Sequence, residues 1–385
     1  MKLSKGLFLA FAGLGLFACS NEDVTENGAQ IEGPADVVVK LDLPGFVNGV
    51  SRAVETGFTT NKIVTPSYVV VTVEGKKGAT VEQEYTGGNI TIQGVEDPTS
   101  IKVEINTKKE SGENNWINVP YSTFAELNEI TVAGTRMIGT VSGVENFMVS
   151  GENYIVTVPV KHTMARLEFG GIKHAAHSGG TCRFKNGNLA GVFLNHVQLH
   201  STAATDDPKD YTEDDIKGAN FFSGNGSTGW WDAITGTDFF PGGSATYPSD
   251  GGCYAYNIYP VEANNAAALP VLTLYFNSLQ EQDNAPSHFV GSEGFALVKT
   301  YKVSKTTMDG NPTLKAALCG ANPTELDEGT NYQVINFPAG YIYQIQTLSV
   351  PDEAVHPDLT GAGVNLVATI TLIDWKIVAG SVDWK

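Results

Sequence analysis

The feature of this sequence that most constrains its fold is a recurring alternation of apolar and polar residues. Residues 101–105 and 154–160 carry isoleucine, valine or tyrosine at every second position. Successive side chains of a β-strand point to opposite faces, so this period predicts half-buried strands. The same alternation returns at 272–276 and 341–345, and clusters of glycine, asparagine, aspartate and serine separate the runs, as turns do. The pattern predicts a mainly all-β fold made of many short strands.

The arrangement of these strands follows from their length and spacing. Residues 68–73 are nearly all apolar and β-branched, which is typical of a strand covered on both faces. Long helical periodicity is absent, and short helices are expected only near 124–128 and 313–318. Many short strands with glycine-rich turns indicate β-sandwiches. A chain of 385 residues can fill two domains, and we place their boundary near Lys161.

The first eighteen residues indicate export. A start containing Lys2 and Lys5 is followed by twelve uncharged residues, 6–17. This run is too short for a membrane-spanning helix, which needs roughly 20 apolar residues, and it fits a signal peptide. Residues 16–19, Leu-Phe-Ala-Cys, resemble the lipobox of bacterial lipoproteins. That resemblance implies a signal peptide over 1–18 and acylation of Cys19; the alternative is an ordinary signal peptide that happens to contain a cysteine.

The charge of the chain restricts its partners. The formal net charge is −18, and removal of residues 1–18 would take Lys2 and Lys5 with it, which gives −20 from 22 basic and 42 acidic residues. Such a charge argues against nucleic acid and against electrostatic binding to an anionic membrane. Ser20 to Asp23 resembles the signal that sends some lipoproteins of the Bacteroidetes to the outer surface. This resemblance implies the outer membrane and the cell surface as the location.

A strand is expected near the beginning of the mature chain. Its apolar face consists of Val37, Val39, Leu41 and Leu43. Residues 44–53 follow as a predicted exposed linker, which contains Arg52, one of only four arginines. An exposed Arg52–Ala53 bond is a substrate for a trypsin-like protease. The alternative is that Arg52 is an ordinary loop residue.

Alternating strands are also expected near the other end of the chain. One runs over 364–372 and another, less regular, over 377–385. The apolar positions of the two are Val364, Leu366, Ala368, Ile370 and Leu372 in the first, and Val378, Val382 and Trp384 in the second. Both ends therefore carry strands that look detachable, although each strand could simply pair within its own sheet.

Taken in order, these features resemble the fimbrillins of the Bacteroidetes, the FimA/Mfa-type subunits of type V pili. Besides the lipobox, the Arg52–Ala53 bond and the C-terminal strands, the resemblance rests on the motifs at 158–167, 191–197, 254–260 and 331–334. It covers nearly the whole chain, and the least matched part is the stretch 201–252.

The resemblance implies a fold and a mechanism. The fold is two transthyretin-like β-sandwich domains in tandem, with short helices and a long insertion, and no cofactor or enzymatic activity. The implied segments are a signal peptide over 1–18, a lipidated tether and removable first strand over 19–52, an N-terminal sandwich over 53–160, and a C-terminal sandwich over 161–385 that includes the insertion 201–252 and a donor strand within 364–385. A protease cuts after Arg52, the first strand leaves, and the donor strand of another fimbrial subunit fills the gap.

The insertion 201–252 has weak strand signals and is long for a loop in a compact domain. It begins with acidic residues and continues with an aromatic run that includes Trp230 and Trp231. These tryptophans could stack on a host glycan or protein, but we favour a role in anchoring the insertion to its domain. The acidic run lacks the glycine and spacing of a calcium loop, so we interpret it as a solvated loop.

Other chemistry is poorly supported. Residues 224–229 match G-x-G-x-x-G, but no strand and helix flank them, so we interpret them as a loop. The three remaining cysteines lack metal-site spacing and are interpreted as buried free thiols, and no metal is expected. Three functions therefore compete: a pilus subunit, which we favour, a lipid-anchored surface lipoprotein that binds glycan or protein without polymerising, and a hydrolase with paired carboxylates, to which no motif points.

Overall fold

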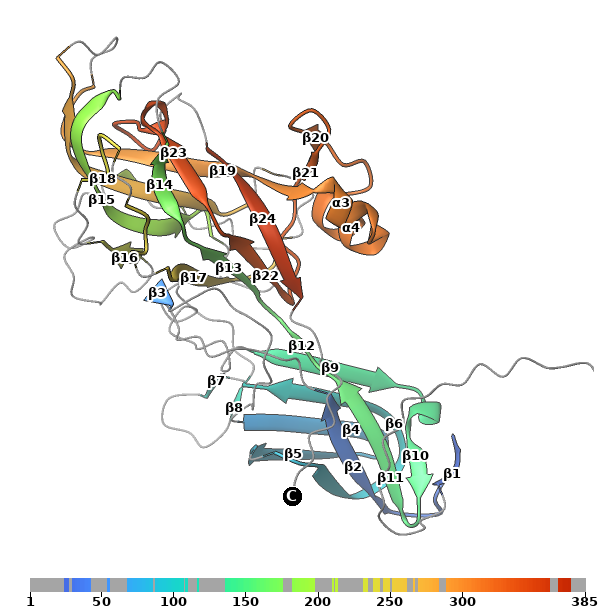
Figure 1. The fold of residues 1–385 in the computed structure, drawn as a ribbon. Coiled ribbons are helices and arrows are strands. Elements are labelled where there is room, and N and C mark those ends of the chain that lie inside the picture. Colours follow the sequence, from blue (N-terminus) through green and yellow to red (C-terminus); the bar gives the residue numbers. More distant parts are fainter. Residues whose placement is uncertain are drawn as a thin grey trace, which may run out of the picture.

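The protein is mainly β, as the alternation predicts, and its strands form two groups (Figure 1). The computed structural model describes residues 24–27, 30–42, 54–55, 68–85, 87–106, 108–109, 116–117, 136–175, 182–197, 210, 212–213, 231–234, 238–242, 245–249, 251–261, 266, 269–283, 289–360 and 366–374. No helix among these residues is long and apolar enough to cross a membrane.

The first group is a sandwich whose two layers share one long strand. Its strands are β1 (Val24–Asn27), β2 (Ala35–Asp42), β4 (Tyr68–Lys77), β5 (Ala79–Glu84), β6 (Ile90–Ile105), β9 (Met137–Ser142), β10 (Met148–Ser150), β11 (Asn153–Pro159) and β12 (Lys161–His162). The start of β6 pairs with β2, and the rest of β6 pairs with β4 and β9. Between these parts Gly94 and Asp97 adopt positive φ, which turns the strand from one layer into the other. A short ladder joins β7 (Lys108–Lys109) to β8 (Trp116–Ile117).

The core of the first group follows the period of two. In β11 the side chains of Tyr154, Val156 and Val158 are buried while their neighbours in sequence are half-buried or exposed. In β4, buried valines cover both faces of the strand at its start, as the continuous apolar run predicts. These side chains pack between the two layers with those of β2, β6 and β9.

The second group is larger and holds both helices of the described residues. Its elements are β3 (Val54–Glu55), β13 (Ala165–Phe169), β14 (Ile172–Ala175), β15 (Phe184–Asn195), β16 (Trp231–Ala233), β17 (Cys253–Ile258), β18 (Val271–Glu281), β19 (Gly294–Ser304), α3 (Lys305–Asp309), α4 (Pro312–Cys319), β20 (Glu325–Leu326), β21 (Asn331–Gln333), β22 (Tyr341–Ile345), β23 (Leu348–Pro351) and β24 (Leu366–Asp374). Helix α4 covers the helix expected at 313–318. It begins at Asn311, whose side chain accepts a hydrogen bond from the Leu314 N–H.

The last strand, β24, joins the two layers of the second group. Leu366 to Ile370 pairs in parallel with β19, and Thr371 to Asp374 pairs antiparallel with β22. Because β19 and β22 belong to different layers, β24 acts as a seam between them (Figure 1).

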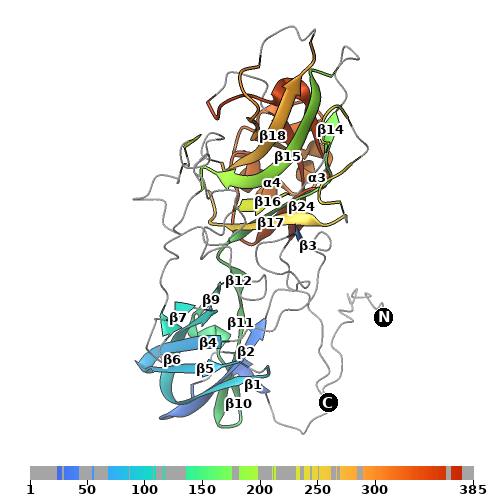
Figure 2. The same ribbon diagram turned by 90° about the vertical axis from the view of Figure 1, so that its left-hand side faces the viewer.

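The chain passes between the groups three times. After β11, the short strand β12 still pairs with β9 in the first group, and β13 then enters the second group. Earlier in the chain, β2 lies in the first group, whereas β3 pairs with the outer edge of β17 in the second (Figure 2), and β4 lies in the first group again. Residues 43–53 therefore connect the two groups along the chain.

Candidate functional site

The feature that best fits a strand exchange is the position of β2, which we call the β2 slot: the space between β11 and β6. Val37 lies opposite Tyr154 of β11 on one edge and Ile92 of β6 on the other. The pairing is parallel to β11 and antiparallel to β6. The same residues of β2 therefore pair with β11 on one edge and with β6 on the other. A strand that replaces β2 with this pairing must run parallel to β11 and antiparallel to β6.

The inward face of β2 fills the slot. The side chains of Val37 and Val39 are 0% exposed, and Ala35 is also buried. Leu41, at the end of the strand, is half-buried and packs against the same core. Burial of a valine side chain contributes about 1.5–3 kcal/mol, so these two valines hold the strand firmly. Leu43, the fourth predicted position, lies outside the described residues.

Polar contacts fix the segment that contains β2. The Ile31 N–H donates to the hydroxyl of Tyr154 at 2.8 Å, and the Gly94 N–H donates to Asp36 Oδ1 at 3.3 Å. At the far end of the strand, burial raises the pKa of the Asp42 carboxyl above its ordinary value. The Tyr154 ring also packs edge-on against Phe147, with 6.4 Å between ring centres. Tyr154 therefore links the segment before β2 to the permanent core.

The segment before β2 differs from the expectation. We expected a flexible tether there, but Val24 to Asn27 forms strand β1, which pairs antiparallel with β10. The sequence missed this strand because four residues, three of them polar, are too short for a period to appear. The segment expected to be removed thus contributes two strands, one at the sheet edge and one inside the sheet. The acylation residue Cys19 lies outside the described residues.

The predicted cleavage site, Arg52 and Ala53, also lies outside the described residues, immediately before β3. The other arginines lie in the folded groups. Arg136 and Arg166 are 6% and 0% exposed, and Arg183 is half-buried and pairs with Glu281 at 2.8 Å. None of these three presents an accessible bond to a protease as a linker residue would.

The predicted donor strand divides into two parts. Leu366, Ala368 and Ile370 are buried in the core of the second group, and Leu372 is half-buried against it. This placement differs from that of a detachable strand, because β24 is the seam between two layers of its own domain. The remaining positions, Val364, Val378, Val382 and Trp384, lie outside the described residues.

The aromatic run of the insertion anchors it at one point. Phe239 and Phe240 are buried among the core side chains of the second group, and their rings lie 5.2 and 5.4 Å from that of Phe276. Trp231 belongs to β16, which pairs with β15, and nothing of its side chain is described. Trp230 lies outside the described residues. Among the described residues, the two phenylalanines anchor the insertion, and the anchoring role of the two tryptophans stays a prediction.

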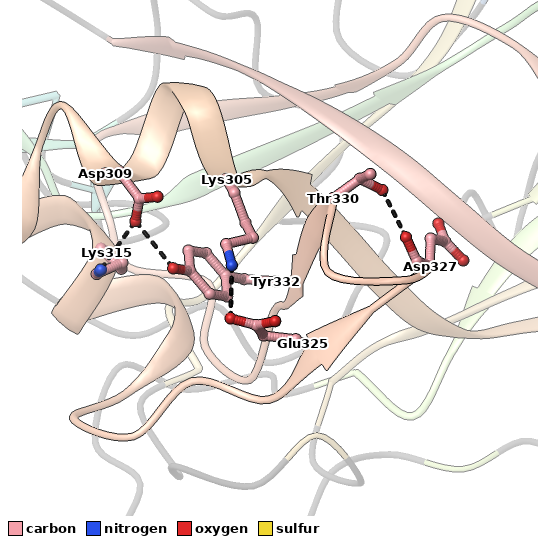
Figure 3. Close-up of polar contacts among 7 residues, drawn as sticks. All are labelled: Lys305, Asp309, Lys315, Glu325, Asp327, Thr330 and Tyr332. Carbon is pink, nitrogen blue, oxygen red and sulfur yellow. Dashed lines mark hydrogen bonds and ion pairs between the residues drawn. The ribbon is translucent and has the colours of Figure 1, made fainter.

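A polar cluster of Lys305, Asp309, Lys315 and Tyr332 lies at the edge of the second group, on α3, α4 and β21. The Tyr332 ring lies between two ammonium groups, those of Lys305 and Lys315, each 5.1 Å from its centre (Figure 3). The Tyr332 hydroxyl donates to Asp309 at 2.9 Å. The hydrogen bond from Lys315, and to a smaller extent the one from Tyr332, holds the pKa of Asp309 below its ordinary value. Because these charges are already paired with one another, the cluster fastens the helices to the sheet.

The described part of the chain holds three free thiols. Cys253 and Cys319 are buried free thiols, and Cys182 is a half-buried one. Burial raises the pKa of the Cys182 and Cys319 thiols to about 11, so neither is a thiolate at neutral pH. Across the described ranges, no group of three His, Cys, Asp or Glu side chains could hold a metal ion.

Comparison with known proteins finds similarity among solved structures. No family model and no curated protein matches the chain. A fimbrilin (FimA) from Porphyromonas gingivalis has 11% identity and a TM-score of 0.49, over 91% of this chain and 99% of that chain. A candidate cell adhesion protein from Bacteroides eggerthii has 15% identity and a TM-score of 0.44, over 90% and 98% of the two chains.

The tip fimbrial protein Mfa3 from Porphyromonas gingivalis, with a C-terminal truncation, has 8% identity and a TM-score of 0.40, over 88% of this chain and 100% of that chain. At such identities and TM-scores the likeness carries no argument about function. These three solved structures are fimbrial and cell-adhesion proteins from the Bacteroidetes. The sequence motifs resemble those of fimbrillins from the same group of bacteria.

Proposed function

We propose that this chain is a structural subunit of a surface fimbria that serves adhesion. It is exported as a lipoprotein acylated at Cys19, reaches the outer membrane, and is cut after Arg52 by a trypsin-like protease. A donor strand from another fimbrial subunit then replaces β2. The observation that carries this proposal is the β2 slot: its strand is paired on both edges and buries Val37 and Val39 completely, yet continues into the linker that holds Arg52.

Removal of β2 would create a strong acceptor for another strand. The facing edges of β11 and β6 would lose their backbone partners over the paired residues. The apolar surface that Val37 and Val39 cover would meet water. Unpaired backbone groups beside an apolar groove recruit an extended segment, because main-chain hydrogen bonds and buried side chains then act together.

The donor comes from the residues beyond β24. Donation of Leu366 to Ile370 would open the core of the donor's own second domain, since these residues form the seam between its layers. The sequence of residues 377–385 carries an apolar face with Val378, Val382 and Trp384. One end of a subunit entering a different surface of the next is a heterologous contact, which propagates into a filament.

The experiment that tests the proposal is the N-terminal sequence and intact mass of the protein sheared from cells. We expect high-molecular-weight material whose chains begin at Ala53. Arg52→Ala should leave a lipidated precursor and no filaments, whereas the matched variant Lys62→Ala, which removes a basic residue ten positions later, should mature normally.

The contrary outcomes are equally specific. Normal filaments from Arg52→Ala would refute cleavage at this bond. A chain that begins at acylated Cys19, is extracted only by detergent and is never polymeric would support the alternative function, a lipid-anchored lipoprotein that binds glycan or protein at the cell surface.

A further inference from the structure

A cavity of about 310 Å³ opens at one end of β15 and β18, beside the middle of β19, in the second group. Three of its lining residues form a row across these neighbouring strands. Asn195 lies opposite Val271, and Lys299 follows Val298, the partner of Leu272, so it stands beside Val271. The size is within the range of pockets for small molecules. The cavity lies far along the chain from the β2 slot and takes no part in the proposed assembly.

Next to Asn195 of this row, the pocket carries the imidazole of His196. Nδ1 of His196 lies 3.0 and 3.2 Å from the two carboxylate oxygens of Asp210. A carboxylate only accepts, so Nδ1 carries the hydrogen, and Nε2 remains to meet a ligand. His196 also adopts φ 57, a conformation uncommon outside glycine that recurs at functional sites. Asp210 comes from the insertion 201–252, which thereby contributes to a binding surface.

The rest of the lining decides the class of ligand. Its apolar members are aliphatic, with Leu269, Leu297 and Leu359 among them, and no Phe, Tyr or Trp stands among its described lining residues, so it suits an alkyl chain better than a sugar face. The Leu359 N–H donates to Glu213 at 2.8 Å, so the insertion also holds this wall. Lys299 is exposed and forms no ion pair with another described residue, so its ammonium is available to an anion.

We propose that this pocket binds a small aliphatic carboxylate. Lys299 and, in its protonated form, the imidazole of His196 bind the carboxylate group, Asp210 holds the ring in place, and the leucine side chains take the alkyl chain. Phosphate is a poorer fit, because the described polar rim offers one lysine and one histidine beside the carboxylate of Asp210, and no arginine.

The test is a calorimetric titration of the full chain with octanoate, with octanol and octylamine as probes of equal chain length. We expect saturable binding of octanoate at one site and binding at least about tenfold weaker for both controls, because the charged hydrogen bonds are lost. Lys299→Gln should weaken octanoate by about tenfold. His196→Asn, which tolerates the same φ, should do likewise.

The matched control is Lys185→Gln, which removes an exposed lysine of β15 that pairs with Asp283 away from the cavity. It should bind octanoate as the parent does. The proposal is overturned if octanoate shows no saturable binding, if octanol binds equally well, if octylamine is preferred, or if Lys185→Gln weakens binding as much as Lys299→Gln. None of these outcomes depends on whether the chain polymerises.

Discussion

Strands β2 and β24 invite comparison, because each has one parallel and one antiparallel neighbour but uses them differently. β2 meets both neighbours with the same residues inside one layer. β24 meets β19 with its first half and β22 with its second, and so crosses from one layer to the other. A single strand can be drawn out of a layer and replaced, whereas loss of a seam separates two layers. The difference teaches that the first of these strands suits exchange and the second suits retention.

The largest effect is expected where the donor enters the slot. Val382→Asp should abolish filaments, because a charge on the apolar face of the donor would have to be buried. Ser381→Asp, one residue away on the opposite face, should assemble normally. Electron microscopy of sheared material distinguishes the two. Filaments of normal length from Val382→Asp would place the donor outside 377–385.

The next test separates the two strands by stability. Ile370→Ala should lower the free energy of unfolding by about 2–5 kcal/mol in both precursor and filament, because β24 stays in its own core. Val39→Ala should cost about 2 kcal/mol in the precursor and nothing in the filament, from which β2 has left. Urea unfolding measures the effect of each variant on the precursor, and urea-induced dissociation measures its effect on the filament. Equal sensitivity of filaments to both changes would refute the difference between the strands.

Acid should weaken the first group through His162. Burial lowers the pKa of this imidazole to about 3, so the folded chain keeps it neutral at pH values where the unfolded chain, with a pKa near 6.5, protonates it. Stability is therefore lost as pH falls from about 6.5 towards 3, by about 2 kcal/mol between pH 7 and 5. Urea unfolding of the parent and of His162→Gln at both pH values checks this. The same pH dependence in both would contradict it.

The smallest effect concerns the anchor of the removable segment. Tyr154→Phe removes the hydroxyl that accepts from the Ile31 N–H and should cost the precursor about 1 kcal/mol. The ring and its packing against Phe147 remain, so the filament should be unaffected. Urea unfolding of the precursor, beside the same filament assay, tests this. A filament weakened as much as the precursor would mean that the hydroxyl has another partner after maturation.

The sequence predicted strands well and their neighbours poorly. Alternation over 154–160 and 366–372 reports which face of a strand is apolar, and the structure confirms that face in β11 and β24. Alternation does not report which sheet a strand joins, so the role of β24 as a seam could not be foreseen. Helix α3, with five residues, is too short to show a helical period.

The β2 slot and the pocket could likewise be predicted only in part, because the sequence pattern does not show which strands and loops come together. Val37 and Val39 were identified by their spacing, and they are the residues that fill the slot. The contact of Ile31 with Tyr154 joins positions 123 residues apart, and no local pattern announces it. The pairing of His196 with Asp210 likewise depends on a fold that brings the insertion beside β15. Spacing therefore finds the members of a site on one strand, and tertiary structure brings in the others.

The direction of the β2 slot has a consequence for any filament built on it. A strand parallel to β11 enters with one polarity, so every subunit must point the same way. Such a polymer has two unlike ends: one presents an open or self-filled groove, the other an unused tail. A subunit that keeps its own β2 cannot receive a neighbour and therefore terminates the chain. Retention or loss of this single eight-residue strand then determines the length of the filament and its attachment to the cell.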